Sequence, residues 1–367
     1  MKKTAAWPLA GIYAVLILYA SLYPFENWRS QGVDWTAFLG APWPRYWTGF
    51  DVLSNVLGYA PLGFVVALAL QRSAPQWPAV TLTLGIGSLL ALAMESLQLF
   101  LPARVPSNLD WCLNSLGTFT GAGAAWVLER FGFLDRWSLF RANWFLPDAK
   151  GSLVLIALWP IALLFPAPVP LGLGHVLERA EEALATRLQA TPWLDWLPVR
   201  EVELQPLLPA YEVLCVSLGQ LLPCLLAFSL VRHWHQKVVF WFLLSALGLL
   251  STALSAALTY GPVHAWGWLS APVQLALALA ALLAWPMMWL KEKTLQVLAL
   301  VGLVLQLTLL NNASASAYFA LTLQNWEQGQ FIRFHGLIQW LGWLWPFVLL
   351  VYLMQRLSAA RPFKMSR

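Results

Sequence analysis

Ten apolar segments dominate the chain, and each is close to the roughly 20 residues that an α-helix needs to cross a lipid bilayer. A bilayer interior offers no water to backbone N–H and C=O groups, so spanning segments of this length must be helical. The pattern predicts an all-α, polytopic membrane helix bundle of about ten transmembrane helices. The expected spans lie near residues 7–23, 51–70, 79–100, 109–128, 151–168, 207–231, 238–258, 269–290, 294–311 and 334–354.

The composition excludes a soluble protein. Of the 367 residues, 59% are hydrophobic and only 11% are charged, which is about half the charged share of a soluble domain. The cysteines Cys112, Cys215 and Cys224 all fall inside apolar runs, where they are expected to be small buried hydrophobic residues. The basic, apolar N-terminus ends without a clear cleavage site, so we interpret it as a retained signal anchor.

Basic residues set the expected orientation, because cytoplasmic loops of membrane proteins are enriched in lysine and arginine. With ten spans and both termini in the cytoplasm, every lysine falls on the inner side, whereas the basic residues outside are all arginine. Topology and anionic inner-leaflet lipid therefore account for the net charge of +5, and no nucleic-acid partner is expected. The lysines are Lys2, Lys3, Lys150, Lys237, Lys291, Lys293 and Lys364.

The longest inner connection, residues 129–150, is the best candidate for a domain boundary. It would separate a four-helix unit, residues 1–130, from a six-helix unit, residues 131–367. The outer loop 169–206 of the second unit has apolar residues at helical spacing opposite charged ones. This pattern indicates an amphipathic helix, either on the membrane surface or as a lid packed on other loops.

A polar pattern, D-x3-N-x2-G, occurs twice at the start of an apolar segment. On an α-helix these positions lie within about 60° of one another and form one narrow stripe. Capping explains an Asp in the first turn but not an Asn one turn deeper, so two copies predict an internal repeat of helix hairpins. The copies comprise Asp51, Asn55 and Gly58, and Asp110, Asn114 and Gly117.

Near the end of the third span, Glu95 and Gln98 lie one turn apart. An ionisable residue there is costly unless it faces other protein or a wet cavity. Arg104 and Ser107 follow in the short loop before Asp110. We therefore expect an outer-facing ring of polar groups between the second, third and fourth spans, with the binding candidates Asp51, Asn55, Glu95, Gln98, Arg104, Ser107, Asp110 and Asn114.

The ring holds three carboxylates, Asp51, Glu95 and Asp110, against the single cation Arg104. Either Glu95 is protonated by its surroundings or the site binds a cationic group. The alternative is a buried polar network that only stabilises the fold. Carboxylate oxygens suit Ca²⁺ or Mg²⁺, but Arg104 would oppose a metal ion, so neither metal nor cofactor is expected.

Small residues follow both stripes, and glycine at such spacing lets helices approach closely. We predict a helix-packing role for Gly58, Pro61, Gly63, Gly117 and Gly121.

These motifs resemble the VanZ-like family of bacterial membrane proteins. The resemblance is carried by "SLYPF", "DVLSNVLGYAPLGF" and "ESLQLFLPAR" followed by "SNLDWCLNSLGTFTG", and it covers about the first 130 residues. It implies a multi-pass protein of the bacterial cytoplasmic (inner) membrane with a role in the cell envelope. The family takes its name from a protein that confers low-level resistance to teicoplanin, and it supplies no settled catalytic residues.

The leading functional hypothesis is non-catalytic binding of a polar or cationic group at the ring. The group would belong to an envelope component, a lipid-linked precursor or an amphiphilic antibiotic. A transporter or flippase is an alternative, but the second and fourth spans turn apolar after Gly63 and Gly123. An enzyme acting on lipid headgroups is a further alternative, although no H-E-x-x-H, G-x-S-x-G or D-x-D motif occurs.

Overall fold

The computed structural model describes residues 6–23, 25, 27–71, 75–102, 104–146, 149–189, 191–196, 207–313 and 332–358. Over these residues the chain is helical and without strands, and one isolated antiparallel bridge joins Phe145 to Val231. The prediction of an all-α chain is confirmed. The chain divides into two compact units, Met1–Phe140 and Arg141–Arg367.

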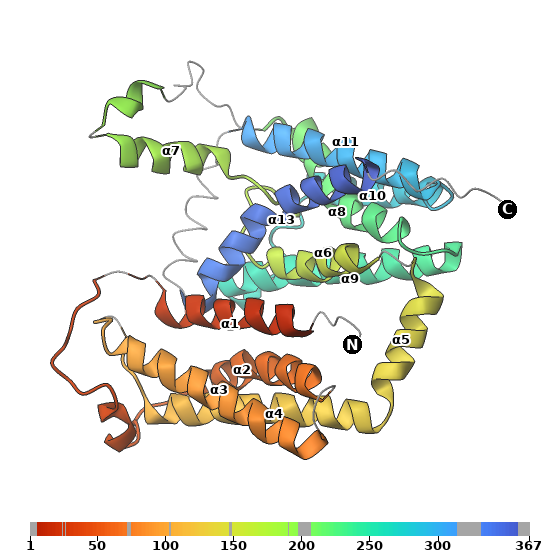
Figure 1. The fold of residues 1–367 in the computed structure, drawn as a ribbon. Coiled ribbons are helices and arrows are strands. Elements are labelled where there is room, and N and C mark those ends of the chain that lie inside the picture. Colours follow the sequence, from red (N-terminus) through yellow and green to blue (C-terminus); the bar gives the residue numbers. More distant parts are fainter. Residues whose placement is uncertain are drawn as a thin grey trace. The chain divides into compact units, whose positions relative to one another are not determined.

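Unit 1 packs its helices around a close pair, α2 and α4. Helix α3 connects the two and packs on α4, while α1 lies along α2 (Figure 1). Because α3 runs back in the opposite direction, α2 and α4 run in the same direction. Their first turns therefore lie at the same end of unit 1. The elements are α1 Ala6–Leu22, η1 Ala37–Gly40, α2 Gly49–Leu70, α3 Gln76–Gln98, α4 Asn108–Arg130 and α5 Phe133–Trp144, whose last residues extend into unit 2.

Unit 2 is built around α8. The C-terminal two thirds of this helix, from Cys215 to Phe228, are almost entirely buried. Helices α9, α10 and α11 pack against it, and α13 packs on α6 and α11. The elements are α6 Lys150–Ala162, α7 Leu177–Leu188, η2 Pro192–Trp196, α8 Pro209–Phe228, α9 Trp234–Tyr260, η3 Pro262–His264, α10 Ala271–Met287, α11 Glu292–Asn311 and α13 Ile332–Ser358.

The apolar helices define a multi-pass membrane protein. Within the described ranges, six of them are long and apolar enough to cross a bilayer, and α1, α6 and α10 are shorter apolar helices. Helix α6, with 13 residues, extends only about 20 Å, less than the bilayer core of about 30 Å. The count of ten spans and the cytoplasmic termini stay predictions. The six are Gly49–Leu70, Trp77–Gln98, Pro209–Phe228, Trp234–Tyr260, Glu292–Asn311 and Leu337–Ser358.

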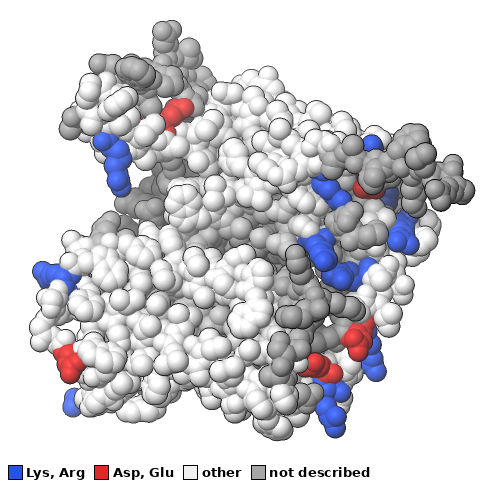
Figure 2. All heavy atoms as spheres, in the orientation of Figure 1, with Lys and Arg blue, Asp and Glu red and all other residues white. Residues whose placement is uncertain are grey.

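Charged side chains are confined to the margins of each unit on the face drawn in Figure 2, and broad uncharged surfaces lie between them. Such a surface suits a hydrocarbon environment, in which exposed apolar side chains carry no cost. Three of the seven lysines that predict the orientation lie outside the described residues: Lys2, Lys3 and Lys364.

The predicted orientation can be tested with single cysteines at exposed loop positions. Tyr46 and Val263 are 94% and 92% exposed, and Tyr46→Cys and Val263→Cys should react with a membrane-impermeant maleimide in intact cells. Lys291→Cys should react only after permeabilisation, because lysine-rich turns stay in the cytoplasm. The background would carry Cys112→Ser, since Cys112 is the exposed native cysteine. The opposite labelling pattern would reverse the orientation.

Candidate functional site

The first turns of α2 and α4 are capped by side chains from the residues just before them. Thr48 Oγ1 accepts from Asp51 N at 3.2 Å, and the Asp51 carboxylate accepts from Thr48 N at 3.0 Å, which completes a capping box. Ser107 Oγ likewise accepts from the first backbone N–H groups of α4. Asp51 therefore has a structural role at the start of α2.

The two polar stripes meet between α2 and α4. Asn55 Nδ2 donates to Asp110 Oδ1 at 3.0 Å. Both side chains are half-buried, so the hydrogen bond connects the Asn of one stripe with the Asp of the other at the same end of the helix pair. A bond to an ionised acceptor in such surroundings is stronger than one between neutral groups.

Glu95 connects the end of α3 with the start of α4. Its side chain is buried, and Oε2 accepts from Ser107 N at 2.9 Å. Ser107 in turn caps α4 through its hydroxyl group. Glu95 thus satisfies a backbone donor of the α3–α4 loop and holds that loop against the last turn of α3.

Gln98, Arg104 and Asn108 bind this region to the end of α1 and to the residue after η1. Gln98 Nε2 donates to Ser21 O at 3.1 Å, and Arg104 Nη2 donates to Tyr23 O at 2.7 Å. Asn108 Nδ2 donates to the carbonyl oxygen of Ala41 at 2.6 Å. Three of the polar residues at this end of unit 1 therefore satisfy backbone carbonyls, which stabilises the fold.

Asn114 and Tyr59 lie one turn deeper. The Asn55–Asp110 hydrogen bond lies four residues before them, and the close contact between Gly63 and Thr118 lies four residues after them. Tyr59 also lies within electrostatic range of Glu95. The side-chain groups Asn114 Oδ1 and Tyr59 OH are buried and have no hydrogen-bond partner within the described part of the chain.

We name this set the polar cluster: Asp51, Asn55, Tyr59, Glu95, Asp110 and Asn114. Its first part, on the first two turns of α2 and α4, is half-buried. Its deeper part is enclosed, since Glu95, Tyr59 and Asn114 are only 3%, 4% and 5% exposed. An unsatisfied buried polar atom costs about 1–3 kcal/mol, so the deeper part is where a hydrogen-bonding ligand or water would stabilise the protein most.

Sequence reasoning missed Tyr59. The residue directly follows Gly58 of the first stripe, but a tyrosine within an apolar run has the same pattern as any core aromatic residue. It also missed a short hydrogen-bonded chain on the other side of α4. There, Trp111 Nε1 donates to Ser88 O at 3.1 Å, and the hydroxyls of Ser88 and Ser115 lie 2.9 Å apart.

Three glycines lie where α2 and α4 touch. A Cβ atom on Gly63 would overlap the carbonyl oxygen of Thr118, and one on Gly121 would overlap that of Ala60. Gly117 has the same relation to Val56. These positions require glycine because backbone meets backbone there.

Two of the predicted packing residues lie outside that contact. A Cβ atom on Gly58 would meet nothing within 4 Å, and the Gly58 carbonyl accepts from Tyr13 OH at 3.1 Å. Pro61 lies on the exposed side of α2. Neither position supports the close approach of α2 and α4.

No group of three or more His, Cys, Asp or Glu side chains within the described ranges is arranged to hold a metal ion. The carboxylates of the polar cluster are instead engaged with hydrogen-bond donors such as Asn55 and Ser107 N.

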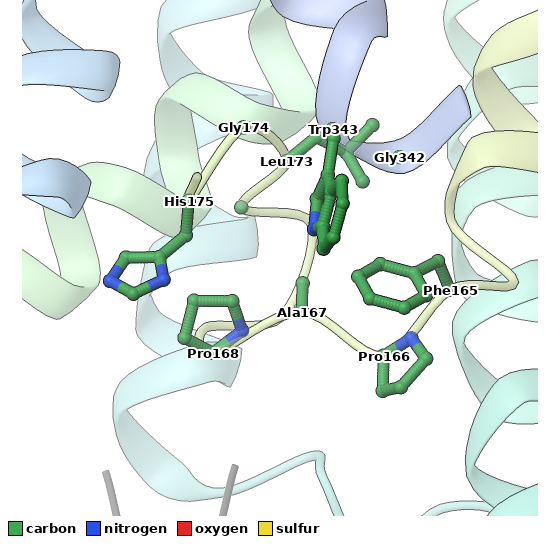
Figure 3. A pocket seen from close by; sticks show the side chains of 10 residues that line it. Phe165, Pro166, Ala167, Pro168, Leu173, Gly174, His175, Gly342 and Trp343 are labelled. Carbon is green, nitrogen blue, oxygen red and sulfur yellow. The ribbon is translucent and has the colours of Figure 1, made fainter. Parts of the chain in front are cut away.

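A separate pocket in unit 2 lies between the loop after α6 and α13 (Figure 3). Phe165 and Trp343 line one side with their rings 6.0 Å apart, edge to face. His175 lies on the other side with its ring directed away from them, and its Nε2 atom is 3.3 Å from Ala313 O. The lining is almost wholly apolar, which is typical of loop packing rather than of a polar binding site.

The apolar helices define the class: a multi-pass helical membrane protein, whose N-terminal unit contains the polar cluster. A model of the VanZ/LLP1 family matches residues 8–129, from the first turn of α1 to the last turn of α4. Unit 1 is therefore VanZ-like, as the sequence motifs predicted. Comparisons with curated proteins and with solved structures found no match.

The glycine contact predicts opposite effects for two neighbouring substitutions on α4. Gly121→Ala should lower the free energy of unfolding by about 1–3 kcal/mol, because its Cβ would force α2 and α4 apart. Gly123→Ala is the matched control: a Cβ there meets nothing within 4 Å, and alanine favours the helix by up to about 1 kcal/mol. Thermal unfolding in detergent measures both. Equal destabilisation by the two variants would contradict the close contact.

Proposed function

We propose that the polar cluster of the VanZ-like unit binds a cationic or hydrogen-bond-donating group without catalysing a reaction. The ligand would be an envelope component, a lipid-linked precursor or an amphiphilic antibiotic that reaches the cluster from the outer face of the bacterial cytoplasmic membrane. A glycopeptide-resistance role would be one outcome of such binding.

The observation that carries this proposal is the buried acceptor Asn114 Oδ1, which has no donor among the residues that the structure describes. Other members of the polar cluster include acceptors, the carboxylates of Glu95 and Asp110, and Tyr59 OH can donate or accept. A ligand that supplies N–H or O–H donors, or a positive charge, complements this set. Burial strengthens such contacts because the local dielectric constant is low.

The packing beyond the cluster favours binding over transport. Past Asn114, Gly63 meets Thr118 and Gly121 meets Ala60 so closely that backbone lies against backbone. The next turns bury apolar residues, among them Ala67, Ala122 and Ala125. A transported polar molecule would need polar groups along this stretch between α2 and α4, and the contact would have to separate.

Replacing Asn114 with leucine tests the deeper part of the cluster. Asn114→Leu keeps the volume of the side chain and removes an unsatisfied buried acceptor, so the folded protein should be as stable or up to about 3 kcal/mol more stable. Ligand binding should be lost. The measurements are thermal unfolding in detergent with and without added teicoplanin or envelope lipid extract, and antibiotic susceptibility of the expressing strain.

Thr118→Val is the matched control, one turn further along α4. Thr118 is fully buried and its hydroxyl already donates to Asn114 O at 3.0 Å within the helix. This variant should leave ligand-dependent stabilisation and susceptibility unchanged. Unchanged ligand response in Asn114→Leu would remove the main support for the binding site.

The charge of the cluster is tested at Glu95. Glu95→Gln retains an oxygen that accepts from Ser107 N, so folded protein should persist while the ligand-linked phenotype weakens. Arg104→Ala loses the bond to Tyr23 O and should reduce folded protein, by about 3–5 kcal/mol in stability if it leaves a buried charge uncompensated. Detergent-stable protein and susceptibility would be measured together. A wild-type phenotype in Glu95→Gln would favour a purely structural network.

A further inference from the structure

Two turns of unit 2 meet through a buried lysine. Lys237, in the first turn of α9, donates through Nζ to Met288 O at 2.6 Å and to Leu290 O at 3.4 Å. These carbonyls lie at the end of α10, where a cation is favoured by the helix dipole. The bond therefore fixes the α8–α9 turn beside the α10–α11 turn.

The joined turns form a concentrated basic surface, which we name the basic turn pair: Arg232, Lys237, Lys291 and Lys293. Arg232, Lys291 and Lys293 are exposed. The carboxylate within these turns belongs to Glu292, which accepts from Gln296 Nε2 at 3.3 Å. Helices α9 and α11 also begin here, and their first N–H groups add positive potential.

A further basic residue lies at the same end of unit 2. The Phe145–Val231 bridge and the hydrogen bond from Leu146 N to Leu230 O hold the start of α6, with Lys150, beside the α8–α9 turn.

Exposed aromatic and apolar side chains adjoin the basic turn pair. Trp234 follows Arg232 at the start of α9, and Trp285 and Trp289 precede Lys291 with their rings 5.3 Å apart. Tryptophan favours the headgroup level of a bilayer. Further along the same helices, Phe242 of α9 and Leu282 of α10 are exposed.

From this placement we infer that the basic turn pair is a binding surface for the headgroup of an anionic phospholipid. The exposed cations would contact the phosphate, the tryptophans would lie at the ester level, and the apolar faces of α9 and α10 would contact the acyl chains. The combination of charge with adjoining apolar surface favours a phospholipid over a soluble phosphate. The inference is independent of the function proposed for unit 1.

The test uses the full chain purified in a non-ionic detergent and native mass spectrometry. Phosphatidylglycerol and phosphatidylcholine with the same acyl chains, and inorganic phosphate, would be titrated separately. We expect phosphatidylglycerol to bind at least about tenfold more tightly than phosphatidylcholine, and phosphate to add no thermal stability. In Lys291→Gln/Lys293→Gln, phosphatidylglycerol affinity should fall about 30-fold, since each basic residue contributes about fivefold.

Two further variants separate lipid binding from general effects of charge. Lys291→Arg/Lys293→Arg keeps both cations and should keep the lipid preference. Arg45→Gln/Arg187→Gln removes two exposed positive charges elsewhere and should not change it. Equal binding of the two lipids by the wild-type chain, retained phosphatidylglycerol affinity in the Gln double variant, or equal stabilisation by phosphate would each overturn the inference. The wild-type comparison decides the matter even if a variant does not purify.

Discussion

The direct backbone contact between α2 and α4 is the constraint on which unit 1 depends. Glycine at positions 63, 117 and 121 removes the side chains that would separate the two helices. Without water, helix association in a bilayer relies on van der Waals packing and hydrogen bonds. The close contact supplies the packing and sets the register that brings Asn55 opposite Asp110.

That register explains why the polar residues serve two purposes. Polar groups within a membrane protein must be satisfied internally, and Glu95, Gln98 and Arg104 do this for the α3–α4 loop and the end of α1. Asn114 Oδ1 and Tyr59 OH are not used in this way. The structural network and the proposed binding site are compatible, because the deeper groups Asn114 Oδ1 and Tyr59 OH take no part in the network.

Two buried polar side chains of unit 2, Asn311 and Lys237, complete helix ends. Asn311, at the end of α11, accepts from the first N–H groups of α7, Val176 N and Leu177 N, both at 3.0 Å, and donates to Gly174 O. Lys237 likewise donates a hydrogen bond to the carbonyl oxygen of Met288, just after the end of α10. In a chain with few charges, single polar residues at helix ends hold the loops in place.

The sequence by itself determined the helical class, since long apolar segments have no other stable form in a bilayer. It also determined helix starts, because Thr48 and Ser107 act within three residues of the backbone groups that they cap. Each of the ten predicted segments contains a helix, but α6 ends early, at Ala162, two residues after Pro160 and before Pro166, Pro168 and Pro170.

The candidate polar residues could be picked from the sequence because a charge within an apolar run is conspicuous. Only the tertiary structure decided which of them meet. Asn55 pairs with Asp110 across two helices, Asp51 serves the α2 cap, and Gly58 has open space although Gly117 of the same pattern does not. The spacing of residues along one helix specifies which residues share a face of that helix. It does not specify which residues of another helix they meet, because that depends on how closely the two backbones approach.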